Sequence, residues 1–270
     1  MNPQQHAQKY PEVWKRFTPR ETLVRYCWYF TAVFVAAWAL RRLEIPWFYF
    51  LDAHTQAADL FARMVPPDWS FFEEIADPLI ETIHIATLGT IVTVVLAMPI
   101  AILSARNTTP NAFTWFIGRF ILVTSRSVNT VVWGLIFVAI FGPGPVAGIW
   151  SIAARSIGFT GKLIAEAIEE IDQGAVEAIE STGASRMQVL VVAVIPQVLP
   201  VIYGTIVYRW DINIRESTVL GFVGAGGIGI VLYSSINLFA WHEVSVMLLA
   251  IFAVVLVSEY ISATVRKRIT

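Results

Sequence analysis

Charged and hydroxyl side chains interrupt two of the most apolar parts of this sequence, one near residue 126 and one between residues 209 and 217. An ionisable group inside a membrane is costly, so it usually faces the interior of a helix bundle or an aqueous path. The guanidinium group of arginine is a planar fork of donors that matches phosphate-like oxyanions. We therefore expect these side chains to line a path or gate for an anion. The residues concerned are Arg126, Ser127, Asn129, Arg209, Asp211, Arg215, Glu216 and Ser217.

The same residues have a structural interpretation. Asp211 and Arg215 are four positions apart, which places them on one face of a helix, where an ion pair would hold a broken helix together. Arg126 could equally be a cation anchored near a membrane interface. Both interpretations stay open on the sequence.

Four glycines follow the second charged group, and three of them formally match the dinucleotide-binding pattern G-x-G-x-x-G. That motif needs a preceding strand, a following helix and an acidic residue about 20 positions further on, and the sequence does not supply this context. We interpret the glycines as a source of backbone freedom, which lets helices approach closely or lets the chain re-enter the membrane. They are Gly224, Gly226, Gly227 and Gly229.

No other set of residues indicates catalysis or metal binding. The 4 histidines are scattered without ligand spacing, and the single cysteine, Cys27, lies in an apolar run. The chain has no P-loop motif, G-x-x-x-x-G-K-[ST], so we expect it to bind no ATP and no other cofactor. A process driven by ATP would need a second chain.

A polar segment between residues 166 and 196 separates two apolar runs. Its apolar residues recur every three to four positions, which is the period of a helix with one apolar face. Gly183 interrupts this pattern, and Pro196 opens the next apolar run. A helix, a glycine break, a short helix and a proline would form an elbow with exposed carboxylates at the membrane surface. Such an elbow could be offered to a soluble partner.

The elbow resembles the EAA loop in permease subunits of binding-protein-dependent ABC importers. Glu177, Ala178, Gly183 and Pro196 match that pattern at the right spacing. The departures are apolar replacements at Ile179, Ala193 and Ile195. In the family this loop docks into a cleft of a cytoplasmic ATPase and transmits its closure to the membrane helices; the plainer alternative is an ordinary cytoplasmic loop. The resemblance assigns ATPase coupling, within residues 166–190, to Glu166, Glu170, Glu177, Ala178, Glu180, Gly183, Arg186 and Gln188.

The composition is that of a membrane protein, because 56% of the 270 residues are hydrophobic, 14% are charged and the mean hydropathy is +0.64. The net charge of −1 gives no reason to expect a nucleic-acid partner. The first apolar run lacks a small-residue cleavage site, so we interpret it as a retained span and not as a signal peptide. We predict an all-α polytopic fold with about six transmembrane helices, at residues 26–40, 80–104, 113–141, 146–164, 191–210 and 244–265.

Basic residues orient these spans by the positive-inside rule. Arg106, Arg186 and the terminal Arg-Lys-Arg fall on the same side as the basic N-terminal residues. We therefore expect both termini and the elbow to be cytoplasmic. Residues 1–25 would form an interfacial lead-in, and the aromatic-rich residues 44–79 would lie at the outer interface with lipid.

Longer stretches narrow the resemblance to the permeases of phosphonate importers. They are residues 215–229, residues 161–169, and Arg126-Ser127 together with residues 133–137. The resemblance covers about residues 80–268 and implies a MetI-like permease domain there, preceded by residues 26–79 with the first span and the outer segment. Asn129 departs from it at a position where relatives commonly have proline, which affects the expected bend of the third span.

The resemblance implies a homodimeric permease in the bacterial cytoplasmic membrane, two copies of an ABC ATPase subunit that carry ATP and Mg²⁺, and an extracytoplasmic binding protein. The implied substrate is phosphonate, phosphate or phosphite, moved by alternating access. Two alternatives stay open: the permease of a methionine-type importer, which shares the elbow, and a membrane scaffold subunit that transports nothing. An enzyme within the membrane is disfavoured because no catalytic set is present.

Overall fold

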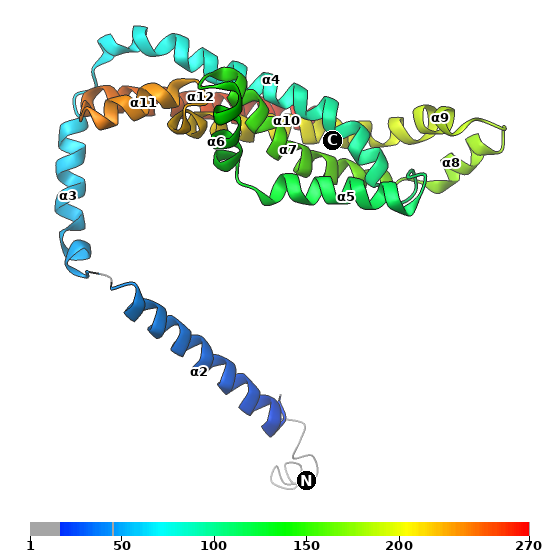
Figure 1. Cartoon of the computed structure of the whole chain (residues 1–270), viewed down its shortest axis with the longest axis horizontal. Helices are drawn as coiled ribbons and strands as arrows, with labels where there is room; N and C mark the ends of the chain where they lie inside the picture. The colour runs from blue at the N-terminus through cyan, green and yellow to red at the C-terminus, as the bar shows by residue number, and fades with distance from the viewer. Residues whose placement is uncertain (1–16, 45, 270) are drawn as a thin grey trace, which may run out of the picture. The chain divides into compact units, whose positions relative to one another are not determined.

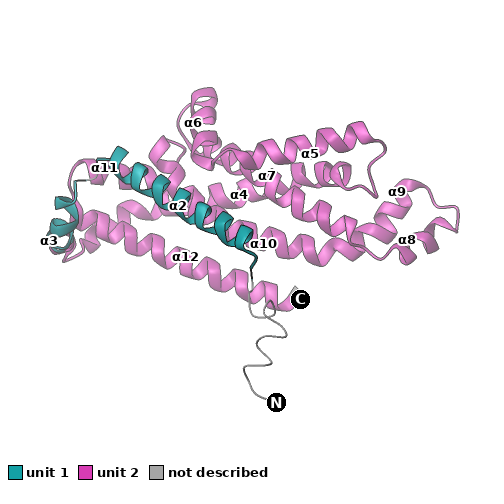
Figure 2. Ribbon diagram, turned by 90° about the horizontal axis from the view of Figure 1, so that it is seen from below, with its two compact units in different colours: residues 1–59 teal, residues 60–270 magenta. Residues whose placement is uncertain are grey.

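The computed structural model describes residues 17–44 and 46–269, and these residues form helices and their connections without a strand (Figure 1). The predicted all-α fold is confirmed. The chain divides into two compact units, residues 1–59 and residues 60–270, which Figure 2 colours separately.

The first unit contains α2 (Pro19–Arg42) and most of α3 (Phe48–Met64). Thr18 and Glu21 form a capping box at the start of α2, in which the Glu21 carboxylate accepts a hydrogen bond from the Thr18 N–H at 2.9 Å. The helix therefore begins well before residue 26, where the first span was predicted to start. Its 24 residues are long and apolar enough to cross a membrane. Of the predicted lead-in, residues 1–16 lie outside the described residues.

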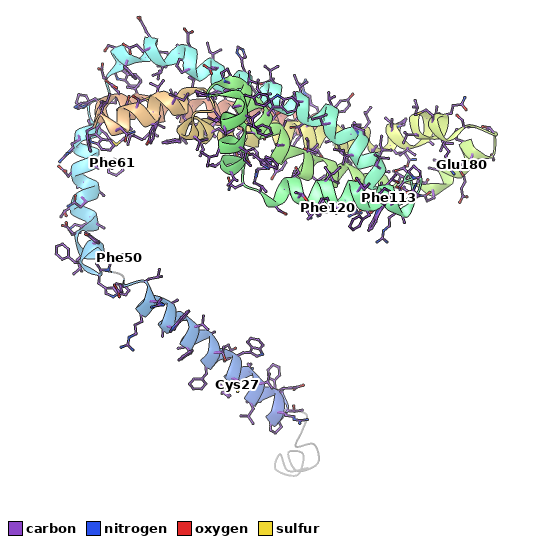
Figure 3. The ribbon with its side chains drawn as sticks, viewed as in Figure 1. Cys27, Phe50, Phe61, Phe113, Phe120 and Glu180 are labelled. Atoms are coloured by element: carbon purple, nitrogen blue, oxygen red, sulfur yellow. The ribbon has the colours of Figure 1, made fainter. Side chains whose placement is uncertain are left out.

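The second unit consists of long helices that pack against one another, with the shorter α6 running across them (Figure 1). Phe113 and Phe120 project outward from α5, as expected of a surface in contact with lipid (Figure 3). The elements of this unit are η1 (Trp69–Phe71), α4 (Phe72–Ser104), α5 (Ala112–Ser127), α6 (Thr130–Phe141), α7 (Pro145–Glu169), α8 (Gln173–Glu180), α9 (Arg186–Val189), the π-helical turn η2 (Leu190–Val194), α10 (Ile195–Leu220), η3 (Gly221–Val223), α11 (Ile228–Asn237) and α12 (Trp241–Ile269).

Helix α7 forms the centre of this unit, where it contacts α4, α5, α6 and α10. Two of its glycines mark close approaches: a Cβ atom at Gly158 would collide with the Leu122 carbonyl of α5, and one at Gly148 with the Ala225 carbonyl. Small residues allow helices in a membrane to pack this tightly. As a result, the polar side chains of α7 lie within hydrogen-bonding reach of several helices.

The predicted number of six spans is not confirmed. Four helical segments of the described chain are long and apolar enough to cross a membrane, and a fifth is added if α5 and α6 count as one bent span. Helix α7 is too polar to qualify. A helix enclosed by other helices does not have to be as apolar as one that faces lipid, which explains this composition.

The predicted third span, residues 113–141, is not one straight helix. It is divided into α5 and α6, which meet at an angle of 96°. Asn129 caps α6, because its side-chain oxygen accepts a hydrogen bond from the Val131 N–H at 3.0 Å. The bend therefore forms without a proline.

Two other predicted boundaries are wrong. The second span was predicted to begin at residue 80, but α4 begins at Phe72, with the acidic residues Glu73 and Glu74 in its first turn, where they favour a helix N-terminus. The fifth span was predicted to end at residue 210, but α10 continues to Leu220. Its charged residues find partners on neighbouring helices, so the whole second charged group lies within one helix.

Candidate functional site

The helical phase of α10 separates its charged residues into two clusters. Arg209 and Glu216 contact residues of α7, whereas Asp211 and Arg215 contact residues of α12. Residues seven apart in a helix share a face, and residues two apart do not. The group that we predicted as one path is therefore two sites.

Glu216 is the point at which three helices meet. Its Oε1 atom accepts a hydrogen bond from Arg209 Nη2 at 3.4 Å and forms an ion pair with Nη1 of Arg155 from α7. Its Oε2 atom accepts a hydrogen bond from the hydroxyl of Thr130 at 2.6 Å. Thr130 is the first residue of α6, whose N-terminus carries partial positive charge. We call Thr130, Arg155, Arg209 and Glu216 the Glu216 cluster.

A chain of hydrogen bonds through α7, α10 and α4 fixes the Arg209 side chain on the side away from Glu216. Arg209 Nε donates to the Ser156 hydroxyl at 3.0 Å, and this hydroxyl donates to Asn213 Oδ1 at 3.0 Å. Asn213 Nδ2 in turn donates to the hydroxyl of Thr90 in α4 at 2.8 Å. The guanidinium carbon of Arg209 also lies 5.4 Å from the centre of the Phe159 ring. Arg209 is thus held in one position between three helices.

The Glu216 cluster is electropositive and partly open. Its two guanidinium groups and one carboxylate leave one positive charge uncompensated. The Arg209 side chain is only 5% exposed, but those of Glu216 and Arg155 are 19% and 31% exposed. A charged group exposed within membrane-spanning helices must face a polar path or another protein chain and not lipid. The arrangement is therefore suited to hold an anion at this face.

The second cluster joins α10 to α12. Arg215 Nη2 lies 2.6 Å from Asp211 Oδ2 and 3.8 Å from Oε2 of Glu259, and the Ser258 hydroxyl donates to Asp211 Oδ1 at 2.8 Å. Two carboxylates around one guanidinium do not favour an anion. Asp211 and Arg215 do form the ion pair of the structural interpretation, but within a continuous helix.

Ser217 is fully buried and forms a structural hydrogen bond. Its hydroxyl donates to the Thr82 carbonyl of α4 at 3.2 Å.

The first charged group is not joined to the Glu216 cluster by hydrogen bonds or ion pairs between described residues. Arg126 is exposed at the end of α5, and its side chain makes neither kind of contact with another described residue. The Ser127 hydroxyl donates to the Val123 carbonyl of its own helix at 2.7 Å, and Asn129 caps α6. The structure instead brings in Thr130, the last residue of the first polar stretch, and Arg155, which lies outside both of the groups that the sequence singled out. Arg155 interrupts an apolar run as Arg126 does. The free-energy cost of placing a charged group inside a membrane could therefore have identified Arg155 as well.

The predicted elbow is formed by α8, a turn and α9. Gly183 in the turn has φ = +78°, and the Ser185 N–H donates to Gln188 Oε1 at 2.8 Å in a capping box that starts α9. Figure 3 shows Glu180 at the tip of this elbow. The other predicted coupling residues of α8 and α9 are also exposed, namely Glu177, Ala178 and Arg186.

The last two predicted coupling residues lie near the base of the elbow, at the end of α7. Glu166 pairs with Lys162 at 3.2 Å, and Glu170 is the exposed residue after the last turn of α7.

A carboxylate that we did not predict fastens the base of the elbow to α5. Glu169 Oε1 lies 2.9 Å from Arg119 Nη2 and accepts a hydrogen bond from the Arg106 N–H, also at 2.9 Å. Next to it, Asn107 Nδ2 donates to the Ile168 carbonyl at 2.5 Å. The end of α7, the loop after α4 and helix α5 are therefore joined where the elbow begins.

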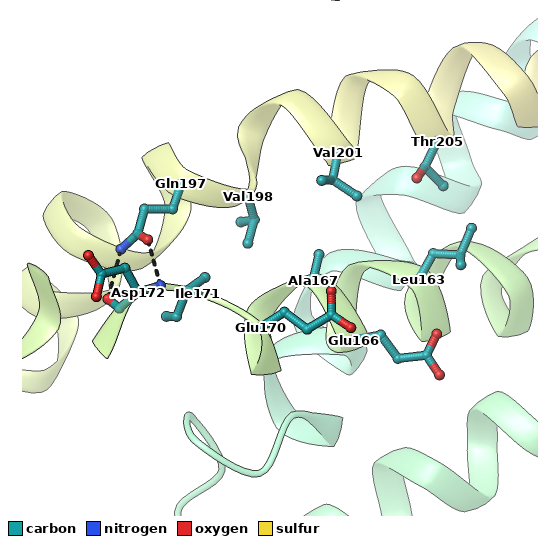
Figure 4. A pocket seen from close by; sticks show the side chains of 10 residues that line it. All are labelled: Leu163, Glu166, Ala167, Glu170, Ile171, Asp172, Gln197, Val198, Val201 and Thr205. Atoms are coloured by element: carbon teal, nitrogen blue, oxygen red, sulfur yellow. Dashed lines mark hydrogen bonds between the residues drawn. The ribbon is translucent and has the colours of Figure 1, made fainter. Parts of the chain in front are cut away.

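A cavity of about 460 Å³ lies between the end of α7 and the start of α10 (Figure 4). Glu166, Glu170 and Asp172 are among its lining residues, and Gln197 closes one end by accepting a hydrogen bond from the Asp172 N–H at 3.0 Å. Three carboxylates make this cavity unsuitable for an anion. In the described part of the chain, no group of three or more His, Cys, Asp or Glu side chains is placed to hold a metal ion.

The glycine segment forms the tight connection between α10 and α11. Gly224, Gly226 and Gly227 have positive φ angles of 85°, 89° and 74°. A Cβ atom at Gly229 would collide with the Thr218 carbonyl and would lie 2.8 Å from the Cα atom of Gly221. The segment follows a helix and not a strand, so it lacks the context of a dinucleotide site.

Residues 97–269 match the family model described as "Binding-protein-dependent transport system inner membrane component". The chain is 39% identical over 238 residues to the phosphite transport system permease protein PtxC of Stutzerimonas stutzeri, which covers 88% of this chain and 86% of that protein. It is 36% identical over 211 residues to the phosphate-import permease protein PhnE of Mycolicibacterium smegmatis. This match covers 78% of this chain and 40% of that protein. Among solved structures, a chain of the inward-facing MetNI methionine ABC transporter matches with a TM-score of 0.65 at 19% identity, covering 75% of this chain and 99% of that chain, which shows a shared fold.

Proposed function

The chain belongs to the family of binding-protein-dependent transport system inner membrane components, and we propose that it is the permease subunit of an ATP-driven importer of phosphite, phosphonate or phosphate. The observation that carries this proposal is the similarity to a phosphite permease over 88% of the chain. The excess positive charge of the Glu216 cluster supports an anionic substrate.

The proposed complex contains two copies of this chain, two copies of an ABC ATPase subunit and an extracytoplasmic binding protein. ATP and Mg²⁺ bind to the ATPase, and this chain catalyses no reaction itself. The elbow, residues 166–190, docks into the ATPase with its exposed carboxylates. Closure of the ATPase dimer then moves the elbow, and the helices joined to its base change the side of the membrane from which the substrate site is open.

Charge separates this proposal from the methionine-type alternative. A zwitterionic amino acid needs a partner for its ammonium group as well as for its carboxylate. The Glu216 carboxylate is already bound by two guanidinium groups and a hydroxyl. The similarity to the methionine transporter structure, at 19% identity, concerns the fold alone.

The first experiment is affinity purification in mild detergent with identification of every chain that co-purifies. The complex is then placed in proteoliposomes, and its ATPase activity and uptake are measured with phosphite, phosphate, a phosphonate or methionine and the matching binding protein. We expect a P-loop ATPase to co-purify and one of the three oxyanions to stimulate ATP hydrolysis and accumulate inside. Recovery of the chain without an ATPase would favour a scaffold role, and uptake of methionine alone would favour the alternative.

A further inference from the structure

We propose that Thr130, Arg155 and Arg209 form a binding site for the transported oxyanion, and that the Glu216 carboxylate occupies this site until the substrate displaces it. This inference rests on the proposed function. Four side chains from α6, α7 and α10 meet here, and three of them donate to the fourth. A carboxylate held in this way stands where an oxygen-rich anion would bind.

The donors suit a tetrahedral oxyanion. Two guanidinium groups donate to Oε1 of Glu216 and one hydroxyl donates to Oε2, and guanidinium groups are the donors that match phosphate-like oxyanions in proteins. When Glu216 moves away, the two guanidinium groups and the N-terminus of α6 surround the site with positive charge only. A neutral substrate gains nothing from this change, whereas an oxyanion replaces the lost carboxylate.

The cluster has a fixed side and a movable side. Arg209 is nine-tenths or more buried, and its Nε atom is anchored to Ser156 at 3.0 Å. Glu216 and Arg155 are partly exposed, and the hydroxyl that holds Glu216 Oε2 belongs to Thr130, directly after the bend between α5 and α6. A small movement of α6 would release one oxygen of Glu216 without disturbing the contacts of Arg209.

The exchange of the Glu216 carboxylate for the substrate keeps the positive charge of Arg209 compensated at every step. A buried guanidinium that loses its only counter-ion is strongly destabilising. Glu216 serves as the counter-ion when the site is empty, and the substrate serves when it is occupied. The same carboxylate excludes small anions such as chloride from the empty site, because a chloride ion has the same charge but cannot accept hydrogen bonds at the positions of both carboxylate oxygens.

The test uses the whole complex in proteoliposomes and two substitutions with opposite expected effects. Arg155→Gln leaves the Arg209–Glu216 pair and the Thr130 contact in place. We expect it to lower oxyanion uptake at least tenfold while the complex still assembles and the loaded binding protein still stimulates ATP hydrolysis. Lys162→Gln removes a positive charge from the same helix at an exposed ion pair, and we expect its uptake to stay within twofold of the unmodified complex.

Glu216→Gln removes the resident anion. In the complex without binding protein, we expect inorganic phosphate and phosphite to bind at least tenfold more tightly than to the unmodified complex, and chloride to compete with them. Glu216→Asp keeps the charge but shortens the reach to Thr130 and Arg155, so the affinity for phosphate and phosphite should increase by a smaller factor. This variant replaces Glu216→Gln in the test if the Glu216→Gln complex does not assemble.

The outcomes separate this inference from the proposed function. If the unmodified complex transports none of the three oxyanions, the proposed function fails. If it transports one of them, but Arg155→Gln is normal or an assembled Glu216 variant binds phosphate no more tightly, the inference about the Glu216 cluster is wrong and the proposed function stands.

Discussion

Arg209 and Arg215 lie in the same helix, but their partners give them different roles. Arg209 is buried and bonded to α7, and together with Arg155 it binds one carboxylate. Arg215 is shared between Asp211 and Glu259 and so links α10 to α12. Charge type and sequence proximity did not distinguish them. The direction in which each side chain leaves the helix decides which one can meet an anion.

Gly229 provides a test of packing at the residue scale. In Gly229→Ala, the new Cβ atom would collide with the Thr218 carbonyl, which is backbone and cannot move aside cheaply. We expect a loss of about 1–3 kcal/mol of stability, as for other overpacked positions. The matched control is Gly204→Ala, which meets nothing within 4 Å in the interior of α10. It should stabilise the helix by about 0.5–1 kcal/mol. Thermal unfolding in detergent checks both, and equal shifts would contradict the packing argument.

At the scale of elements, the elbow projects from the helix bundle and is fixed to it at one end. Its helices α8 and α9 are short and expose their charged residues, so they contribute little to the core. Its base is fixed by Glu169, which holds Arg119 of α5 and the backbone of Arg106. In the proposed mechanism, a force applied to the elbow would therefore reach α5 and α7 together, and α7 contains Arg155.

The turn between α8 and α9 depends on the conformation of Gly183. Its φ of +78° is strained for a β-branched residue, whereas asparagine tolerates this region. A Cβ atom there would meet no atom within 4 Å, so any effect comes from the backbone and not from a clash. We expect Gly183→Val to uncouple ATP hydrolysis from uptake, lowering the uptake per ATP severalfold, and Gly183→Asn to stay near normal. Unchanged coupling in Gly183→Val would count against the proposed role of the elbow.

For the whole molecule, the long helices of the second unit place the elbow and the turn between α11 and α12 at opposite ends (Figures 1 and 2). Helix α4, with 33 residues, runs between these ends. At 1.5 Å per residue it is about 50 Å long, which is enough to cross a membrane. The two ends are thus expected on opposite sides of the membrane, with the elbow in the cytoplasm.

Cysteine labelling tests this topology. Cys27 is the only cysteine in the sequence, so Cys27→Ser gives a background without thiols. In that background, Thr182→Cys in the elbow should react with an impermeant maleimide only after the membrane is permeabilised. Leu238→Cys, at an exposed position in the opposite turn, should react in intact cells. Labelling of both from the same side would contradict the topology, and Cys27→Ser alone controls for background reaction.

The sequence by itself determined the features that depend on short-range patterns. Long apolar runs indicated the membrane helices. Apolar periodicity and the spacing of Glu177, Gly183 and Pro196 located the elbow, because turns and helix ends are set by neighbouring residues. The ion pair of Asp211 and Arg215 also follows from spacing within a single helix.

Only the tertiary structure decided which charged residues come together. Arg155 and Glu216 are 61 positions apart, Thr130 and Glu216 are 86 apart, and Arg119 and Glu169 are 50 apart. No local rule relates such positions, because their contacts depend on how α5, α6, α7 and α10 pack and on the bend before Thr130. The sequence therefore supplied the arginines, and the packing of helices decided that Arg209 and Arg155 share one carboxylate while Arg126 stays outside that cluster.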